Sequence, residues 1–395
     1  MMFDEGQGKK PKTNVTITFL IGNGFDLGLG LRTRYIDFLD SYLKVDTNVS
    51  VLATMKKKIG KDFQSWGDAE LAFGKLPFST FGNDFHSVVK ECLADFSDSL
   101  SNYLAREENR FIKPDDKLKL AFSIRLLSYY QALGEYAKMD ELNRIKRYAT
   151  VKVNIINFNY TETIDKMLVT SGAIELPELG KVNVQISPIC HVHGSLSTKH
   201  SRLFGVNTIS QVEDSHLSDV SKMLLVKPTI DRMAGCHLES KAKRMIDESD
   251  TVIVFGMSMG ATDRIWWDYL ANHIRNSSEY RRLFLAPYVS CQHGATCLAE
   301  EGEWAEIERR RFYDAIEAQK NYYSIENLGE NIDVFLRGPY HDPDGQQVFC
   351  DPFCLSWFGK KLVSDSQETM PSSGQAGSIA DPLSNRWSKN VEDSQ

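Results

Sequence analysis

The pattern of apolar residues near the start of the chain predicts a strand followed by a helix. An apolar run over residues 15–21 stops at Gly22-Asn23-Gly24. Apolar side chains then recur between Tyr35 and Leu43 at the spacing of one helix face. A glycine turn at this point lets the backbone approach a ligand closely and directs amide groups and the positive helix end toward it. Phosphate is the usual ligand of such turns.

The same kind of pattern continues along the chain and predicts an α/β fold. Further extended apolar runs predict strands at 151–158, 182–192, 222–228, 251–256, 281–290 and 331–337. Helical stripes fall between them, and Pro287 suggests that the strand at 281–290 is an edge strand or contains a bulge. Strands that alternate with helices predict a doubly wound, mostly parallel, Rossmann-like sheet, whose ligands bind at the carboxyl ends of the strands.

Composition and pattern divide the chain into four parts. Residues 1–14 are polar and predict a flexible arm, whereas 15–45 together with 150–340 predict the α/β domain. Residues 46–149 carry helical stripes, for example at 85–100, and predict a helical insertion. Residues 363–395 are rich in Ser, Gly and Pro without periodicity, which is typical of a disordered tail.

The net charge and the cysteine content reduce the number of possible functional classes and cell compartments. The net charge of −7 argues against a surface that wraps nucleic acid. We expect a cytoplasmic protein, because the sequence contains neither a secretory signal nor an apolar stretch of about 20 residues. Seven scattered cysteines fit free thiols in a reducing compartment. Cys291, His293, Cys297, Cys350 and Cys354 match no common zinc spacing, so we predict no metal site.

Polar residues follow four of the predicted strands. The four turns are Gly22-Asn23-Gly24-Phe25-Asp26, Asn157-Phe158-Asn159-Tyr160-Thr161, His191-Val192-His193-Gly194-Ser195 and Gly256-Met257-Ser258-Met259-Gly260, with Asp263 beyond the last. In a parallel sheet all four lie along one rim. Asp26 and Asp263 have a simpler interpretation as helix caps, and Asn159 as a turn residue. His191 and His193 alternate on a strand end and point to opposite faces, so one of them is expected to be structural.

These turns resemble known nucleotide-binding elements. In their order they are similar to the loops of the sirtuin-like fold, with Asn159 and His193 at the positions of its catalytic Asn and His. A closer resemblance is to the AbiH family of bacteriophage abortive-infection proteins. It covers about residues 15–290 and rests on LIGNGFDLGLGLRTRYIDF (20–38), Trp66-Gly67-Asp68-Ala69-Glu70, NFNYTETID (157–165), HVHG (191–194) and FGMSMGATD (255–263).

The resemblance implies an antiphage effector that hydrolyses NAD. Tyr35 stands where sirtuins have an arginine, and no paired Cys-x-x-Cys zinc module follows the histidine, so protein deacetylation is disfavoured. NAD is then the substrate and no separate cofactor is expected. By resemblance, Asn159 orients the water or a ribose hydroxyl and His193 acts as the base. The implied nucleotide-binding residues are Gly22, Asn23, Gly24, Phe25, Asp26, Thr33, Tyr160, Gly256, Ser258 and Asp263.

Two other classes of function stay open. The first is a module that senses a nucleotide or an ADP-ribose derivative without turnover, and the second is a toxin that acts on nucleic acid. We also expect a homo-oligomer, a phage-derived trigger or partner protein, and no membrane partner. Trp66, Asp68 and Glu70 lie in the predicted insertion, where packing by the tryptophan and plain surface charge are favoured over a lid or metal ligands.

Overall fold

The computed structural model describes residues 13–198, 203–275, 281–288, 295, 297–316 and 331–364. The predicted N-terminal arm, apart from Thr13 and Asn14, lies outside these residues. The predicted C-terminal tail does so too, apart from Val363 and Ser364.

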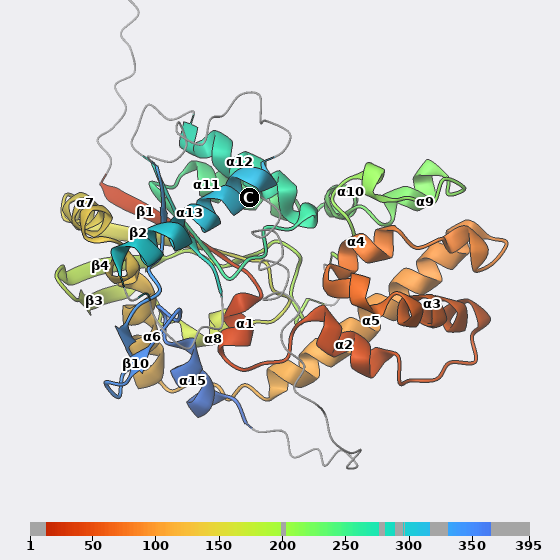
Figure 1. Ribbon diagram of the computed structural model, residues 1–395, viewed down its shortest axis with the longest axis horizontal. Helices are drawn as coiled ribbons and strands as arrows, with labels where there is room; N and C mark the ends of the chain where they lie inside the picture. The colour runs from red at the N-terminus through yellow and green to blue at the C-terminus, as the bar shows by residue number, and fades with distance from the viewer. Residues whose placement is uncertain are drawn as a thin grey trace, which may run out of the picture. The chain divides into compact units, whose positions relative to one another are not determined.

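A mixed sheet of eight strands forms the centre of the molecule, and the predicted α/β fold is confirmed (Figure 1). The strand order is β3-β4-β2-β1-β6-β7-β8, and β5 also pairs with β2. All pairs in this sheet are parallel except that of β3 with β4. The strands are β1 (Asn14–Ile21), β2 (Thr150–Asn157), β3 (Gly172–Leu176), β4 (Gly180–Ile186), β5 (Cys190–His191), β6 (Thr251–Phe255), β7 (Arg282–Ala286) and β8 (Ile332–Val334).

Strand β1 is central because both of its edges are paired. It pairs in parallel with β2 from Asn14 opposite Thr150 to Ile21 opposite Asn157, and with β6 on its other edge. The chain builds outward from β1 first on the β2 side and later on the β6 side. The point where the order reverses therefore lies between β1 and β6, which is where ligands bind in open α/β sheets.

Helices cover both faces of the sheet and form a third layer beside it (Figure 1). On one face α6, α7 and α15 pack against alternate residues of β1, and on the other α11, α12 and α13 close a second core. The described helices are α1 (Gly24–Gly28), α2 (Tyr35–Tyr42), α3 (Ser50–Lys61), α4 (Ala69–Gly74), α5 (Phe85–Asn109), α6 (Asp116–Leu127), α7 (Glu135–Ile145), α8 (Thr163–Met167), α9 (Asp219–Met223), α10 (Lys227–Met233), α11 (Leu238–Asp247), α12 (Arg264–Arg275), α13 (Leu298–Ala315) and α15 (Leu355–Leu362).

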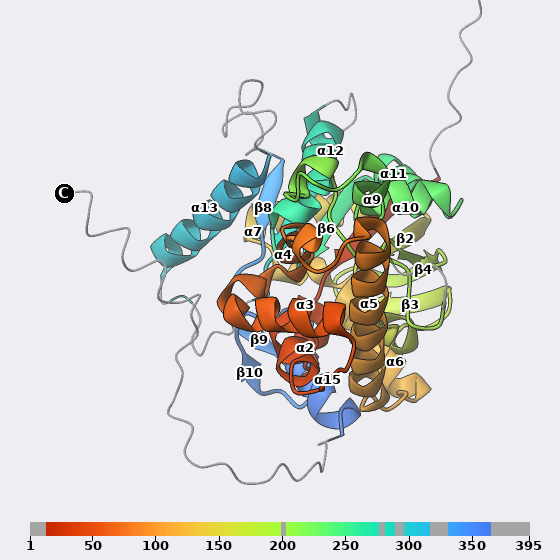
Figure 2. The same ribbon diagram turned by 90° about the vertical axis from the view of Figure 1, so that its right-hand side faces the viewer.

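The third core, which we call the insertion core, is built by α2 to α5 together with residues 204–226 (Figure 2). Its centre is aromatic, because the Phe96 ring lies 5.1 Å from that of Phe73 and 4.9 Å from that of Phe204, measured between centroids. The predicted insertion at 46–149 is thus divided, since α6 and α7 cover the sheet while α3 to α5 form this separate core.

Two strand predictions are wrong for local reasons. Residues 222–223 end α9 and 227–228 begin α10, and the turn between them contributes only an isolated bridge between Val206 and Val226. Pro228 occupies the first turn of α10, where its missing N–H leaves no bond unmade. An apolar run of this length does not distinguish a strand from a buried helix. Strand β7 is not an edge strand, since it pairs with β6 and β8, and Pro287 follows its last residue.

The cysteine prediction holds for most of the described thiols. Cys92, Cys190, Cys236, Cys297 and Cys354 are free, and three of them are buried. Cys350 departs from the prediction because it is disulfide-bonded. No described helix is both long and apolar enough to cross a membrane.

We predict that Gly256→Ala destabilises the fold by roughly 2–4 kcal/mol. Gly256 has a φ of +62°, and an added Cβ would lie 2.7 Å from Cα of Gly24. Urea unfolding measures the effect. Gly302→Ala is the control. Gly302 lies in α13, and an added Cβ there meets nothing within 4 Å, so the stability of this variant should equal or exceed that of the unmodified protein. Equal stability of both variants would contradict the close packing of the two turns.

Candidate functional site

The predicted turns meet at one edge of the sheet, as expected for parallel strands. The Phe158 amide donates to the Ile21 carbonyl at 2.9 Å, and Nδ2 of Asn159 donates to the Gly22 carbonyl at 3.1 Å. The Gly22 amide in turn donates to the Phe255 carbonyl at 2.9 Å. The loops after β1, β2 and β6 are therefore bonded directly to one another.

The glycines of these turns are required by packing between the loops. An added Cβ on Gly22 would lie 2.7 Å from the Gly256 carbonyl oxygen, and one on Gly24 would lie 2.5 Å from Cα of Gly256. The amides of Gly24 and Phe25 donate to the carbonyls of Gly256 and Gly22. These amides are thus already used, and pyrophosphate binding by this turn remains a prediction that needs the turn to rearrange or other groups to bind.

The other predicted nucleotide-binding residues have diverse partners. Asn23 and Thr33 bond to each other, with the Thr33 hydroxyl donating to Oδ1 of Asn23 at 2.5 Å and Nδ2 of Asn23 donating to the Thr33 carbonyl at 3.2 Å. The Tyr160 hydroxyl donates to the Leu203 carbonyl at 2.7 Å. Ser258 is exposed. The Asn23–Thr33 pair joins the glycine turn to the segment that leads into α2.

Asp26 is a buried acceptor beneath the site. Its two carboxylate oxygens accept hydrogen bonds from the hydroxyls of Thr161 and Thr163, at 2.6 and 2.5 Å. Burial raises the pKa of Asp26 to about 6, although both hydroxyls oppose the shift. Asp26 therefore connects α1 to the loop after β2. This role differs from the helix cap that the sequence suggested for Asp26.

The buried ring of His193 packs against the segment that carries Asn159. Its ring packs against Phe158 and Tyr160, the two neighbours of Asn159 in sequence, with centroid distances of 5.6 and 6.1 Å. Asn159 and His193 are each 8% exposed. The structure thus brings the two predicted catalytic residues to the same part of the sheet edge.

A buried lysine links His193 to a glutamate of the insertion core. Nζ of Lys227 lies 3.3 Å from Nε2 of His193 and 2.5 Å from Oε2 of Glu70. The Tyr35 hydroxyl donates to the other oxygen, Oε1, of Glu70 at 3.3 Å. Lys227 is 3% and Glu70 5% exposed, so this is a salt bridge shielded from water.

Two further carboxylates complete an acidic cluster around this lysine. Asp68 caps α4 through the Leu71 amide at 3.0 Å and accepts from the Thr262 hydroxyl at 3.2 Å. Oδ1 of Asp263 is buried without a hydrogen-bond partner. We call the group of Asp68, Glu70, His193, Lys227 and Asp263 the acid–lysine cluster.

Burial and the neighbouring charges shift the pKa values of the groups in this cluster. Burial raises the pKa of Glu70 to about 7, and Lys227 only partly opposes the shift. Burial alone would lower the pKa of Lys227, but the charges of Glu70, Asp263 and Asp68 outweigh burial and raise it. Burial and the nearby Lys227 hold the pKa of His193 well below its usual value, so its imidazole is neutral. The cluster therefore keeps a charged lysine beside a glutamate that titrates near neutrality.

Sequence reasoning named His193 and Asp263 as site residues, left Asp68 and Glu70 out of the predicted site, and missed Lys227. Lys227 interrupts the apolar run at 222–228, and a lysine in a buried run was the available signal. Trp66 packs in the insertion core as expected, at 5.9 Å from the Phe96 ring. The expectation of plain surface charge for Glu70 is wrong, because Lys227 comes from a segment 157 positions later and buries it.

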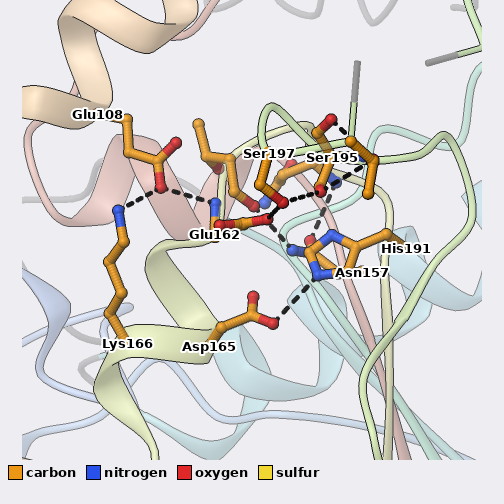
Figure 3. A network of polar contacts seen from close by, with 11 residues as sticks. Glu108, Asn157, Glu162, Asp165, Lys166, His191, Ser195 and Ser197 are labelled. Atoms are coloured by element: carbon orange, nitrogen blue, oxygen red, sulfur yellow. Dashed lines mark hydrogen bonds and ion pairs between the residues drawn. The ribbon is translucent and has the colours of Figure 1, made fainter. Parts of the chain in front are cut away.

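His191 belongs to a separate polar network, shown in Figure 3. Its Nε2 lies 3.1 Å from Oδ1 of Asp165 on α8. Burial lowers the pKa of His191, but the hydrogen bond and charge of Asp165 outweigh it and raise the pKa overall. Glu162 in the same network accepts from Ser197. The two histidines therefore have different partners, as their alternation predicts.

Neither a metal-binding group nor the cavity of about 340 Å³ coincides with the acid–lysine cluster in the described part of the chain. Among the described residues, no group of three or more His, Cys, Asp or Glu side chains is arranged to hold a metal ion. A cavity of about 340 Å³ is lined by Arg125, Ser128 and Tyr340 among others, and by none of the acid–lysine cluster.

The fold and the rim of polar loops define a Rossmann-like α/β protein with an acidic, buried cluster at the carboxyl edge of its sheet. Residues 18–284 match the family described as bacteriophage abortive infection AbiH, and the chain belongs to this family. The match spans the sheet from β1 to β7, the insertion core and the acid–lysine cluster. No curated protein and no solved structure matches the chain.

We predict that the stability of Asp26→Asn relative to the unmodified protein rises by up to about 3 kcal/mol between pH 4 and pH 7. The folded pKa of Asp26 is raised from 3.8 to about 6. Its contribution to stability is therefore complete at low pH and is lost as the pH rises through the folded value. The asparagine of the variant stays neutral, so the pH has no such effect on its contribution to stability.

Urea unfolding at a series of pH values measures this difference. Asp40→Asn is the control, because that carboxylate lies on the surface of α2 with 64% of its side chain exposed. Its difference from the unmodified protein should stay flat. A flat difference for Asp26→Asn as well would contradict the raised pKa.

Proposed function

We propose that this abortive-infection protein hydrolyses NAD at the bond between ribose and nicotinamide. The observation that carries the proposal is the acid–lysine cluster, in which three carboxyl groups surround one ammonium group at the carboxyl edge of the sheet. A buried excess of carboxylate stabilises positive charge in a ligand.

Positive charge is what this reaction presents to the protein. The nicotinamide ring of NAD is cationic and leaves without being protonated. As the bond breaks, positive charge moves to the ribose and gives an oxocarbenium-like transition state, which carboxylates stabilise in glycoside hydrolysis. The acidic cluster fits this charge better than it fits a phosphate group.

The sequence-derived roles form part of the proposal. Asn159 orients the attacking water or a ribose hydroxyl, and its amide is already held by the Gly22 carbonyl. His193 lies beside it, within the acid–lysine cluster. The glycine turns at Gly22 to Phe25 and the Gly256 loop bind the rest of the dinucleotide, after the rearrangement that their amide bonds require.

The proposal also covers how the protein is activated and how it assembles. Glu70, Lys227 and His193 are buried, so we propose that substrate reaches them when the insertion core moves relative to the sheet edge. A phage-derived trigger and homo-oligomerisation are the events that we propose to supply this movement. They also explain how an effector of this kind is kept inactive before infection.

We predict that His193→Ala and Asn159→Ala lower the rate of NAD hydrolysis by roughly 100-fold or more and abolish phage protection. The purified full-length chain is incubated with NAD, with and without extract of phage-infected cells. Chromatography then measures nicotinamide and ADP-ribose. His216→Ala removes an exposed histidine and should behave as the unmodified protein.

Two results would contradict NAD hydrolysis. Protection against phage with intact NAD pools and no nicotinamide release would rule it out. Calorimetric binding of NAD without any turnover, weakened by Asn159→Ala, would instead support the second candidate, a nucleotide sensor. The burial of Glu70, Lys227 and His193 is the observation that favours this alternative.

A further inference from the structure

We infer that Glu70, a residue of the insertion core, accepts the proton of the attacking water, and that Lys227 and His193 position it. This inference rests on the proposed function and changes the role that sequence resemblance gives to His193. It follows from how each group is held: the one lone pair of the His193 ring faces the ammonium group of Lys227, whereas the carboxylate of Glu70 has lone pairs beyond those that contact Lys227 and Tyr35.

Both ring nitrogens of His193 are engaged. The ammonium group of Lys227 has only donors, so its 3.3 Å contact makes Nε2 of His193 an acceptor. The other nitrogen, Nδ1, then carries the hydrogen and bonds to the Phe158 backbone. A histidine whose lone pair faces a buried ammonium is a poor base, because protonation would place two cations side by side.

Glu70 is held where it can accept a proton. Lys227 contacts one of its oxygens at 2.5 Å and Tyr35 the other at 3.3 Å, so the carboxylate is fixed from α10 and α2. Lys227, Tyr35, Asp68 and Asp263 are the titratable groups around it. Burial and the two neighbouring aspartates raise the pKa of Glu70 to about 7 against the effect of Lys227. A carboxylate in that range gains and loses protons readily at neutral pH.

The proposed step balances. The bond between C1′ of the ribose and the ring nitrogen breaks, and its electron pair stays on the nitrogen, which gives neutral nicotinamide. A bond forms between C1′ and the water oxygen, and the water proton passes to Glu70 and then to solvent. The products are nicotinamide, ADP-ribose and one proton, with no oxidation or reduction.

The geometry also makes the insertion core a part of the active site. Glu70 and Asp68 stand at the start of α4 and are anchored by packing of Trp66 and Phe73 in that core. His193 follows β5, and Lys227 begins α10. The proton acceptor therefore reaches the sheet edge only when the insertion core is docked there, so the core both covers the site and completes it.

The test compares pH–rate profiles of NAD hydrolysis by full-length variants. The unmodified protein should gain activity as the pH rises, with a half-maximum near 7, since the deprotonated form of Glu70 is the base. Glu70→Gln should lose roughly 100-fold or more and give a flat profile. Glu70→Asp should retain part of the activity. His193→Gln keeps an acceptor for Lys227 and should stay within about 10-fold of the unmodified rate.

Glu308→Gln is the matched control. Glu308 on α13 is also buried and forms a salt bridge of 2.6 Å with an arginine. Burial raises the pKa of Glu308 as well, but this residue lies outside the acid–lysine cluster. It should leave the profile unchanged. Circular dichroism of each variant confirms that the fold is retained, and Asp68→Asn provides a second test should Glu70→Gln fail to fold, with an expected loss of activity.

The outcomes separate the two proposals. Activity of Glu70→Gln equal to that of the unmodified protein, or a 100-fold loss in His193→Gln, overturns the inference and leaves NAD hydrolysis standing. When the unmodified protein protects cells but does not consume NAD, the proposed function fails. In that case the role of Glu70 is tested by phage protection. Protection by Glu70→Gln overturns the inference. Loss of protection in a folded Glu70→Gln variant supports Glu70 as the acid–base group for another substrate.

Discussion

The burial of one lysine among three carboxyl groups is the constraint on which the site depends. Lys227 is nearly inaccessible to water, and a buried ammonium is stable only when an anion lies against it. Glu70 provides that anion from the insertion core. The sheet edge and the insertion core are therefore linked by electrostatics as well as by packing, and separating them leaves two charges uncompensated unless water or a ligand replaces the contact.

The glycine loops are required by packing at the end of the sheet. Gly22, Gly24 and Gly256 permit the ends of β1 and β6 to touch at distances that no Cβ allows. Their amides bond across this contact, so the pattern that suggests phosphate binding also closes the point where the strand order reverses. A glycine turn after a strand is thus not by itself evidence of a nucleotide site.

The acidic character of the cluster determines its local electrostatics. A low local dielectric strengthens the interaction between the three carboxyl groups and the ammonium group of Lys227. The neutral state of His193 follows from the same field, because the ammonium of Lys227 opposes a second cation. One buried arrangement of charge therefore accounts for both the neutral histidine and the raised pKa of Glu70.

The sequence by itself determined the order of most strands and helices, the parallel sheet, and the loops carrying Asn159 and His193, because hydrophobic period and turn residues are local properties. It failed for residues 222–228, where an apolar run is compatible with either a strand or short helices. Only the tertiary structure decided that Glu70 is buried and that Lys227 lies between it and His193. Those contacts join segments up to 157 positions apart, and burial changes protonation in a way that no single stretch of sequence contains.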